Sequence, residues 1–199
     1  MALRRDPTKV AQQGKGRIVT GQSDNLTALI PAWVDGVLTP VGKLDAHVKG
    51  LRHKAVSVFV IGPDGILLQQ RAAGKYHTPG LWANTCCTHP HWDEAPETCA
   101  IRRLEEELGI TGAAPEWRQQ VEYRADVGGG LTEHEVVDIF VVTVDAPLTI
   151  AANPDEVQAV RWVARDVLVT ELARDPDLFT PWLHIYMAEH ADAIFAAIE

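Results

Sequence analysis

The chain has 199 residues, of which 18 are Lys or Arg and 27 are Asp or Glu, giving a formal net charge of −9. With 46% hydrophobic and 23% charged residues, it has the composition of a globular protein with a core and not of a disordered or collagen-like chain. The acidic balance argues against nucleic acid as a partner, because binding a phosphate backbone requires a surplus of basic side chains. A small phosphorylated ligand remains compatible, since a few basic residues in one pocket are enough to hold it.

The location of the protein is also constrained. The longest apolar stretches, 55–61 and 136–144, are far shorter than the ~20 residues that a membrane span requires. No apolar segment follows the basic residues Arg4 and Arg5, so we expect no secretory signal and predict a cytoplasmic protein without an obligate protein partner. The three cysteines are odd in number and two are adjacent, which implies neither a disulfide framework nor a zinc ribbon.

Strands are predicted along most of the chain. Residues 1–26 are polar, and their five basic and two acidic side chains give a charge of +3, which predicts a flexible basic arm. We expect one domain over 27–199. Alternating and β-branched residues, bounded by Gly- and Pro-containing turns, predict strands at 29–34, 55–61, 66–70, 86–87, 123–126, 133–144 and 157–163.

Two helical regions complete the predicted fold. The first spans 96–108, with Pro96 in its first turn and Gly109 as its stop. The second follows Thr180, the expected N-cap, and carries an apolar stripe of Leu183, Met187, Ile194 and Ile198. Strands and hairpins with helices between and after them predict an α/β (α+β) fold, in which a mixed β-sheet is sandwiched between helices.

The first helix carries an unusual charge pattern at its end. Glu105, Glu106 and Glu107 stand at the negative end of the helix dipole, which is unfavourable. Arg102 and Arg103 precede them at i,i+4 spacing, but in the weaker basic-then-acidic order. Two interpretations stay open from these residues alone: a salt-bridged solvent face, or a site for a cation.

A second carboxylate pair lies in the strand at 133–144. Because side chains alternate in a strand, Glu133 and Glu135 share one face with the apolar row Val137, Ile139 and Val141. Carboxylates in such a place need a partner or a metal, unless the strand end reaches solvent. Imidazole ligands for a metal are available from His47, His53 and His89, although their spacing forms no compact signature.

The resemblance to a known family is carried by several motifs. Glu94, seven further residues, and the run 102–110 resemble the Nudix box, G-x5-E-x7-REUxEExGU, with Thr88 in place of Gly and Arg103 in place of the first Glu of the box. The Trp-x-Asn-x-x-Cys-x-His-Pro run at 82–90 and Glu-x-Glu at 133–135 are similar to type 1 isopentenyl-diphosphate isomerases. This resemblance covers about 29–185 and implies a Nudix fold, although His47 and His53 lie one residue closer than in the bacterial pattern.

The resemblance implies a site and a reaction. It implies that one divalent ion, Mn²⁺ or Zn²⁺ as well as Mg²⁺, is bound by His47, His53, His89, Glu133 and Glu135. A second ion, Mg²⁺, would be held by Glu107 with the backbone carbonyl of Cys87. The substrate is then a small diphosphate, gripped by Lys43, Arg71, Lys75 and Arg103.

The implied reaction interconverts isopentenyl and dimethylallyl diphosphate by adding and removing a proton. Cys87 and Glu135 resemble the acid–base pair, with Tyr123 beside Glu135 and the ring of Trp182 stabilising a carbocation. The residues leave open which group gives the proton. A Nudix diphosphate hydrolase is the alternative, and Arg103 argues against it because a hydrolase needs a carboxylate there. A non-enzymatic binding module ranks last, since each expected ligand type is present.

Overall fold

The computed structural model describes residues 28–146 and 148–196. The predicted arm at 1–26 lies outside the described residues, so the division into an arm and one domain stays a prediction. Within the described ranges the strands are β1 (Leu29–Val34), β2 (Val37–Gly42), β3 (His53–Gly62), β4 (Gly65–Arg71), β5 (Trp82–Ala83), β6 (Cys86–Thr88), β7 (Glu116–Asp126), β8 (Thr132–Thr143) and β9 (Val157–Val163). The helices there are α2 (Lys43–Lys49), α3 (Pro96–Leu108), α4 (Arg165–Arg174), α5 (Pro181–Glu189) and α6 (Ala191–Phe195), with a short 3-10 turn, η1 (Pro176–Leu178).

The sheet is mixed, as predicted, and β3 is at its centre. β3 pairs in parallel with β8 from His53↔Glu135 to Ile61↔Thr143, and antiparallel with β1, β4 and β6. β7 extends the sheet beyond β8, and β9 pairs with β4. Because β3 and β8 run side by side in register, the functional side chains at their first residues are brought together at one end of the sheet.

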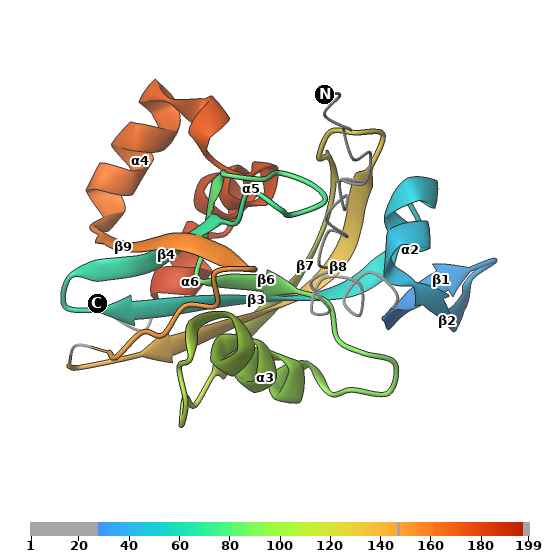
Figure 1. Cartoon of the computed structure of the whole chain (residues 1–199), viewed down its shortest axis with the longest axis horizontal. Helices are drawn as coiled ribbons and strands as arrows, with labels where there is room; N and C mark the ends of the chain where they lie inside the picture. The colour runs from blue at the N-terminus through green and yellow to red at the C-terminus, as the bar shows by residue number, and fades with distance from the viewer. Residues whose placement is uncertain (1–27, 147, 197–199) are drawn as a thin grey trace, which may run out of the picture.

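Helices cover both faces of the sheet, which confirms the predicted sandwich (Figure 1). On one face, α4, α5 and α6 pack buried Leu168, Leu183 and Ile194 against the apolar row of β8. On the other face, α3 packs Leu104 and Leu108 against β3, β4 and β8. Because side chains alternate along a strand, the same strands supply both cores from alternate residues.

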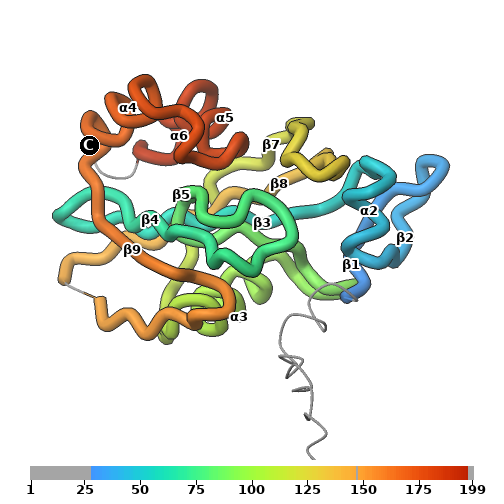
Figure 2. Tube along the Cα trace, turned by 45° about the horizontal axis from the view of Figure 1, so that its top comes forward, coloured from blue at the N-terminus to red at the C-terminus, as the bar shows by residue number. Residues whose placement is uncertain are grey.

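A third, smaller apolar cluster lies at one end of the molecule. Ile30 and Ala32 of β1 pack there on Ala46 of α2, apart from the two main cores. Figure 2 shows β1, β2 and α2 gathered together, away from α4–α6. No helix in the described ranges is long and apolar enough to span a membrane.

The predicted elements differ from the structure in several places. α2 and α4 were not predicted, and β7 begins at Glu116, seven residues before the predicted strand. α2 has only seven residues, too few to show a helical period, and ends at Gly50, whose φ of 58° is left-handed. The predicted stop of α3 at Gly109 is confirmed, with a φ of 65°.

The C-terminal helical region differs from the prediction in its continuity and in its cap. The helix is interrupted at His190, where α5 gives way to α6. Ile198 of the predicted stripe lies outside the described residues, so its place in the stripe stays a prediction. Thr180 occupies the N-cap position, but its side chain makes no capping hydrogen bond and its Oγ1 is buried without a partner. Thr180 therefore starts the helix through its extended backbone and not through its hydroxyl.

Candidate active site

Most of the predicted site residues line a single cavity. Ten of the thirteen line it: Lys43, Arg71, Lys75, Cys87, His89, Arg103, Tyr123, Glu133, Glu135 and Trp182. His47 and His53 are fully buried behind the cavity and contact Glu133. Glu107 does not line the cavity. A wider cleft lies beside it along α3 and shares Lys43, Thr88, His89 and Arg103 with it.

A buried cluster of three histidines and one glutamate, hereafter the His–Glu centre, consists of His47, His53, His89 and Glu133. One potential ligand atom from each of these residues lies within 4.8 Å of the others. Oε2 of Glu133 is 3.0 Å from Nε2 of His47 and 3.3 Å from Nε2 of His53. α2, β3, β8 and the segment after β6 each contribute one residue, so the shorter spacing between His47 and His53 still brings both to the centre.

The hydrogen bonds behind this centre decide what it can hold. Nδ1 of His47 donates to the carbonyl of Lys43 at 2.6 Å, and Nδ1 of His53 donates to the carbonyl of Leu51 at 2.7 Å. When neutral, imidazoles bonded in this way direct their Nε2 lone pairs at Oε2 of Glu133, which makes no hydrogen bond of normal geometry. Converging lone pairs repel one another unless a cation lies between them, so the donor set fits a divalent metal ion.

Glu135 lies next to this centre. Its Oε1 is 2.9 Å from Nε2 of His89 and 3.8 Å from Nε2 of His53, while its Oε2 accepts a short hydrogen bond from the hydroxyl of Tyr123. Tyr123 and Glu135 are directly paired between β7 and β8. Glu135 thus contacts both the metal-ligand set and a phenol, the arrangement expected of a carboxylate that serves two roles.

Charge in the centre follows from burial and pairing. Burial lowers the pKa of His89, whereas burial raises that of Glu133 but hydrogen bonds from the histidines bring it well below its usual range. Burial also opposes protonation of His53, yet its hydrogen bonds with Glu133 and Glu135 raise its pKa to about 10. In the metal-free protein a proton on His53 therefore supplies the positive charge that the anions require.

His77 is a site residue that the sequence reasoning missed. Its Nε2 lies 3.1 Å from Oε1 of Glu133, the oxygen that faces away from the other histidines, and burial lowers its pKa to about 4. It belongs to the loop between β4 and β5, just before the run at 82–90 that carried part of the family resemblance. Nothing in the spacing of a loop histidine shows which strand it faces.

Cys87 reaches the cavity from β6. Its side chain and that of Cys86 point to opposite faces: Cys87 packs on the core beneath α5, and Cys86 on the core beneath α3. The thiol donates to Oδ1 of Asn84 at 2.8 Å, and burial raises the pKa of Cys87 to about 12. The thiol form is therefore the resting form.

The predicted diphosphate ligands are grouped around a carboxylate that the sequence reasoning missed. Glu156, which immediately precedes β9, forms a short ion pair with Lys75 and lies 3.5 Å from Nη2 of Arg103. Despite burial, the charges of Lys75 and Arg103 lower the pKa of Glu156 to about 2. Burial, together with Lys75 and Arg103, lowers the pKa of Lys43 to about 7. These cations are crowded enough to favour binding of an anion.

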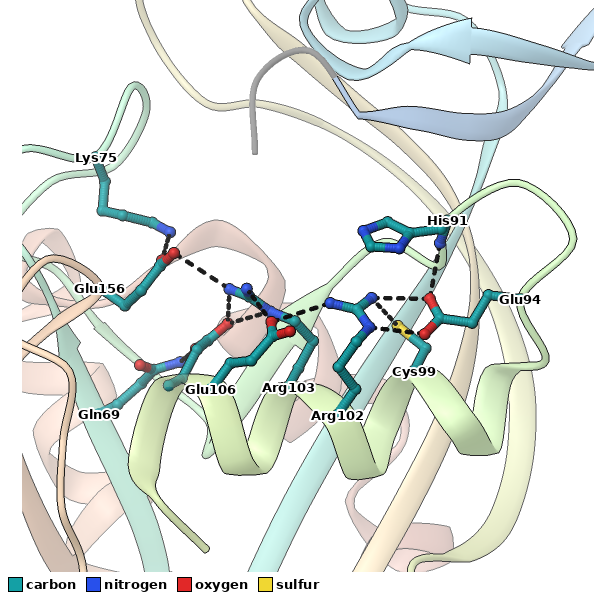
Figure 3. A network of polar contacts seen from close by, with 10 residues as sticks. Gln69, Lys75, His91, Glu94, Cys99, Arg102, Arg103, Glu106 and Glu156 are labelled. Atoms are coloured by element: carbon teal, nitrogen blue, oxygen red, sulfur yellow. Dashed lines mark hydrogen bonds and ion pairs between the residues drawn. The ribbon is translucent and has the colours of Figure 1, made fainter. Parts of the chain in front are cut away.

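Two of the three carboxylates at the end of α3, Glu106 and Glu107, are paired with the two arginines of the helix. Figure 3 shows Arg102 and Arg103 beside Glu106. Arg103 donates to Oε1 of the buried Glu107, whose Oε2 accepts from Gln69 at 3.0 Å. Arg102 is paired with Glu94 at 2.7 Å and with the half-exposed Glu106 at 3.0 Å. The protein's own arginines thus meet the need for positive charge at this helix end, and a Mg²⁺ ion at Glu107 stays a prediction.

Trp182 of α5 closes one side of the cavity. Its ring is buried, the guanidinium carbon of Arg71 lies 5.3 Å from the ring centroid, and His77 packs edge-on at 5.9 Å. Arg71 also donates to the carbonyl of His77 at 3.1 Å. The face of an aromatic ring attracts positive charge, as the position of Arg71 over the Trp182 ring illustrates.

Comparisons with known proteins point to one family. The model of the NUDIX domain matches residues 51–183. The chain is 65% identical over 173 residues to the isopentenyl-diphosphate Delta-isomerase of Roseobacter denitrificans, covering 87% of this chain and 98% of that protein. It is 62% identical over 167 residues to the protein of the same name from Ruegeria pomeroyi, covering 84% and 93%.

Solved structures show the same fold at low identity. A protein from Deinococcus radiodurans matches with a TM-score of 0.64 and 15% identity, covering 80% of this chain and 96% of the other. A MutT NUDIX hydrolase from Burkholderia pseudomallei matches with a TM-score of 0.55 and 23% identity, covering 70% and 98%. Fold and close relatives together identify this chain as a member of the NUDIX domain family and, within it, of the isopentenyl-diphosphate Delta-isomerases.

Proposed function

We propose that this chain interconverts isopentenyl diphosphate and dimethylallyl diphosphate, with Cys87 and Glu135 as the acid–base pair. One observation carries the assignment of roles: a thiol and a carboxylate line the same cavity as the cations Lys43, Lys75 and Arg103. The curated relatives bear the name of this activity. The alkene of the substrate is then placed between two proton-transfer groups while its diphosphate is held by charge.

The chemistry is proton transfer without oxidation or reduction. One group donates a proton to the terminal alkene carbon, whose π electrons form the new C–H bond and leave a tertiary carbocation. The other group removes a proton from the carbon next to the cation, and that C–H electron pair becomes the new double bond. The ring of Trp182 faces the cationic carbon and excludes water, so that proton loss is favoured over capture by water.

The diphosphate is bound by Lys43, Arg71, Lys75 and Arg103. Before the substrate binds, Glu156 is the resident anion of this group and keeps Lys75 and Arg103 close together. The diphosphate competes with Glu156 for these cations, and charge-assisted hydrogen bonds to its oxygens replace those to the carboxylate.

The metals are assigned by ligand chemistry. His47, His53, His89, Glu133 and Glu135 would hold Mn²⁺ or Zn²⁺, which accept mixed imidazole and carboxylate ligands, with Mg²⁺ also compatible. When bound, this ion supplies fixed positive charge that keeps Glu135 ionised and oriented. Glu107, with the backbone carbonyl of Cys87, would hold Mg²⁺ for the diphosphate, and Arg103 would then exchange its bond to Glu107 for a bond to the substrate.

The test is an assay of purified protein with isopentenyl diphosphate, Mg²⁺ and Mn²⁺, in which dimethylallyl diphosphate and released phosphate are followed together. We expect isomer without phosphate from the natural chain, and no isomer from Cys87→Ala or Glu135→Gln at unchanged far-UV circular dichroism. Loss of at least ~100-fold in kcat is the scale for removing an acid–base group. Turnover retained in both variants contradicts the acid–base assignment, and phosphate without isomer supports the hydrolase alternative.

A further inference from the structure

Ser57 is a buried hydroxyl in the middle of β3 that the mechanism above does not use. Only 1% of its surface is exposed, and it is paired directly with Cys87 between β3 and β6. Its Oγ lies 3.3 Å from Sγ of Cys87 and 2.8 Å from the hydroxyl of Tyr186. Directly opposed residues of antiparallel strands have adjacent side chains, so Ser57 contacts the thiol from behind the cavity.

Asn84 contacts the same thiol from a second direction. Its Nδ2 donates to the carbonyls of Val58 at 3.0 Å and Cys86 at 3.2 Å, and the side chain is fully buried. These two bonds decide the orientation of the amide, because a flipped amide would direct its oxygen at two carbonyls. Oδ1 is therefore a fixed acceptor, and the 2.8 Å bond from Cys87 gives the thiol a defined direction.

Tyr186 holds Ser57 and also contacts the other half of the acid–base pair. It is fully buried on α5, and its ring packs edge-on against Tyr123 at 5.9 Å between centroids. Tyr123 in turn donates to Glu135. One rigid aromatic residue therefore lies behind both Cys87, through Ser57, and Glu135, through Tyr123.

A thiol needs such partners to have a defined position. It is a weak hydrogen-bond donor, and a cysteine side chain has three staggered rotamers about one bond. Proton transfer to or from a bound alkene requires the reacting atoms about 3 Å apart and aligned. We infer that Ser57, held by Tyr186, is a positioning residue that fixes the Cys87 thiol for proton transfer. This inference rests on the proposed role of Cys87.

Steady-state kinetics of Ser57→Ala and Tyr186→Phe test the inference. Ser57→Ala removes the hydroxyl that contacts the thiol, and Tyr186→Phe removes the hydroxyl that holds Ser57 while keeping the ring. We expect kcat to fall about tenfold in Ser57→Ala and less in Tyr186→Phe, with KM for isopentenyl diphosphate unchanged, because neither residue lines the cavity. Since both act through one hydroxyl, the double variant should match Ser57→Ala within about twofold.

Two controls separate positioning from a loss of stability. Ser57→Thr keeps the hydroxyl and should restore most of kcat. Val142→Ala trims a buried residue of β8 in the core on the opposite face of the sheet, and it should lower the melting temperature without lowering kcat. Independent, multiplying effects of Ser57→Ala and Tyr186→Phe would overturn the inference, as would a rise in KM at constant kcat or no rescue by Ser57→Thr.

The proposed function and this inference can fail separately. Isomerisation that survives in Cys87→Ala removes the basis for both. Isomerisation that is lost in Cys87→Ala but unchanged in Ser57→Ala leaves the role of Cys87 intact and overturns only the positioning role of Ser57.

Discussion

The His–Glu centre and the charge network of α3 are two polar regions that are built in opposite ways. Along α3 each buried carboxylate has a protein cation: Glu107 has Arg103, and Glu94 has Arg102. In the His–Glu centre, three imidazole nitrogens converge on Glu133, whose Oε2 makes no hydrogen bond of normal geometry.

This difference shows that the His–Glu centre needs a ligand, whereas the charge network of α3 does not. A network whose charges are paired within the protein forms when the chain folds, so its ion pairs contribute to the free energy of folding. A centre whose ligand atoms converge on one position forms its full set of interactions only when a metal ion is bound. Those interactions contribute to the free energy of metal binding. Carboxylate count alone does not distinguish the two, whereas the hydrogen bonds of the partner side chains do.

The largest effect is expected for Arg103→Met. This substitution leaves the buried Glu107 with its hydrogen bond from Gln69 but without a cation, which should lower the free energy of unfolding by about 3–5 kcal/mol in urea titrations without substrate. Combining it with Glu107→Leu removes the uncompensated charge and should recover much of the loss. A double variant less stable than the single variant would show that the network is not self-compensating.

Glu133→Gln tests the other side of the comparison. Removing the central anion should weaken Mn²⁺ binding by about 100-fold, or about 2.7 kcal/mol, in calorimetric titrations after chelation. The matched control is Glu122→Gln, an exposed glutamate of β7 paired with Arg52, for which we expect unchanged binding. If Glu133→Gln binds Mn²⁺ as tightly as the natural chain, the ion is held elsewhere.

The smallest effect is expected for Glu106→Gln. The side chain of Glu106 is 44% exposed and shares Arg102 and Arg103 with better-buried carboxylates. Exposed ion pairs contribute about 0–1 kcal/mol, so both the stability and the rate of isomerisation should change little. A large fall in isomerisation would instead assign Glu106 a role at the metal or the diphosphate.

Helix ends and the buried face of a strand could be predicted, because each depends on residues within one element. α3 begins and ends at the predicted residues because Pro96 and Gly109 mark its ends. Glu133 and Glu135 could be placed on the buried face because the period of a strand is two. The residue types of the centre followed from the family motifs, but their convergence did not follow from spacing.

The parts of the site and of the fold that the sequence did not predict depend on contacts between elements distant in the chain. His77 and Glu156 lie in loops, where no period indicates which way a side chain points. Ser57 stands in a run of apolar and β-branched residues, and only the pairing of β3 with β6 places it against Cys87. α2 has seven residues, so its stability comes from packing on β1 and not from a helical pattern.

The position of His47 has a consequence for hydrogen exchange. Of the four residues of the His–Glu centre, His47 alone stands on α2, in the small cluster with β1, while His53 and Glu133 belong to the central strands. A bound ion therefore cross-links a small unit to the main sheet. Amides of α2 should exchange through local opening in the metal-free protein and slow down with rising Mn²⁺ concentration, while those in the middle of β3 exchange only on global unfolding.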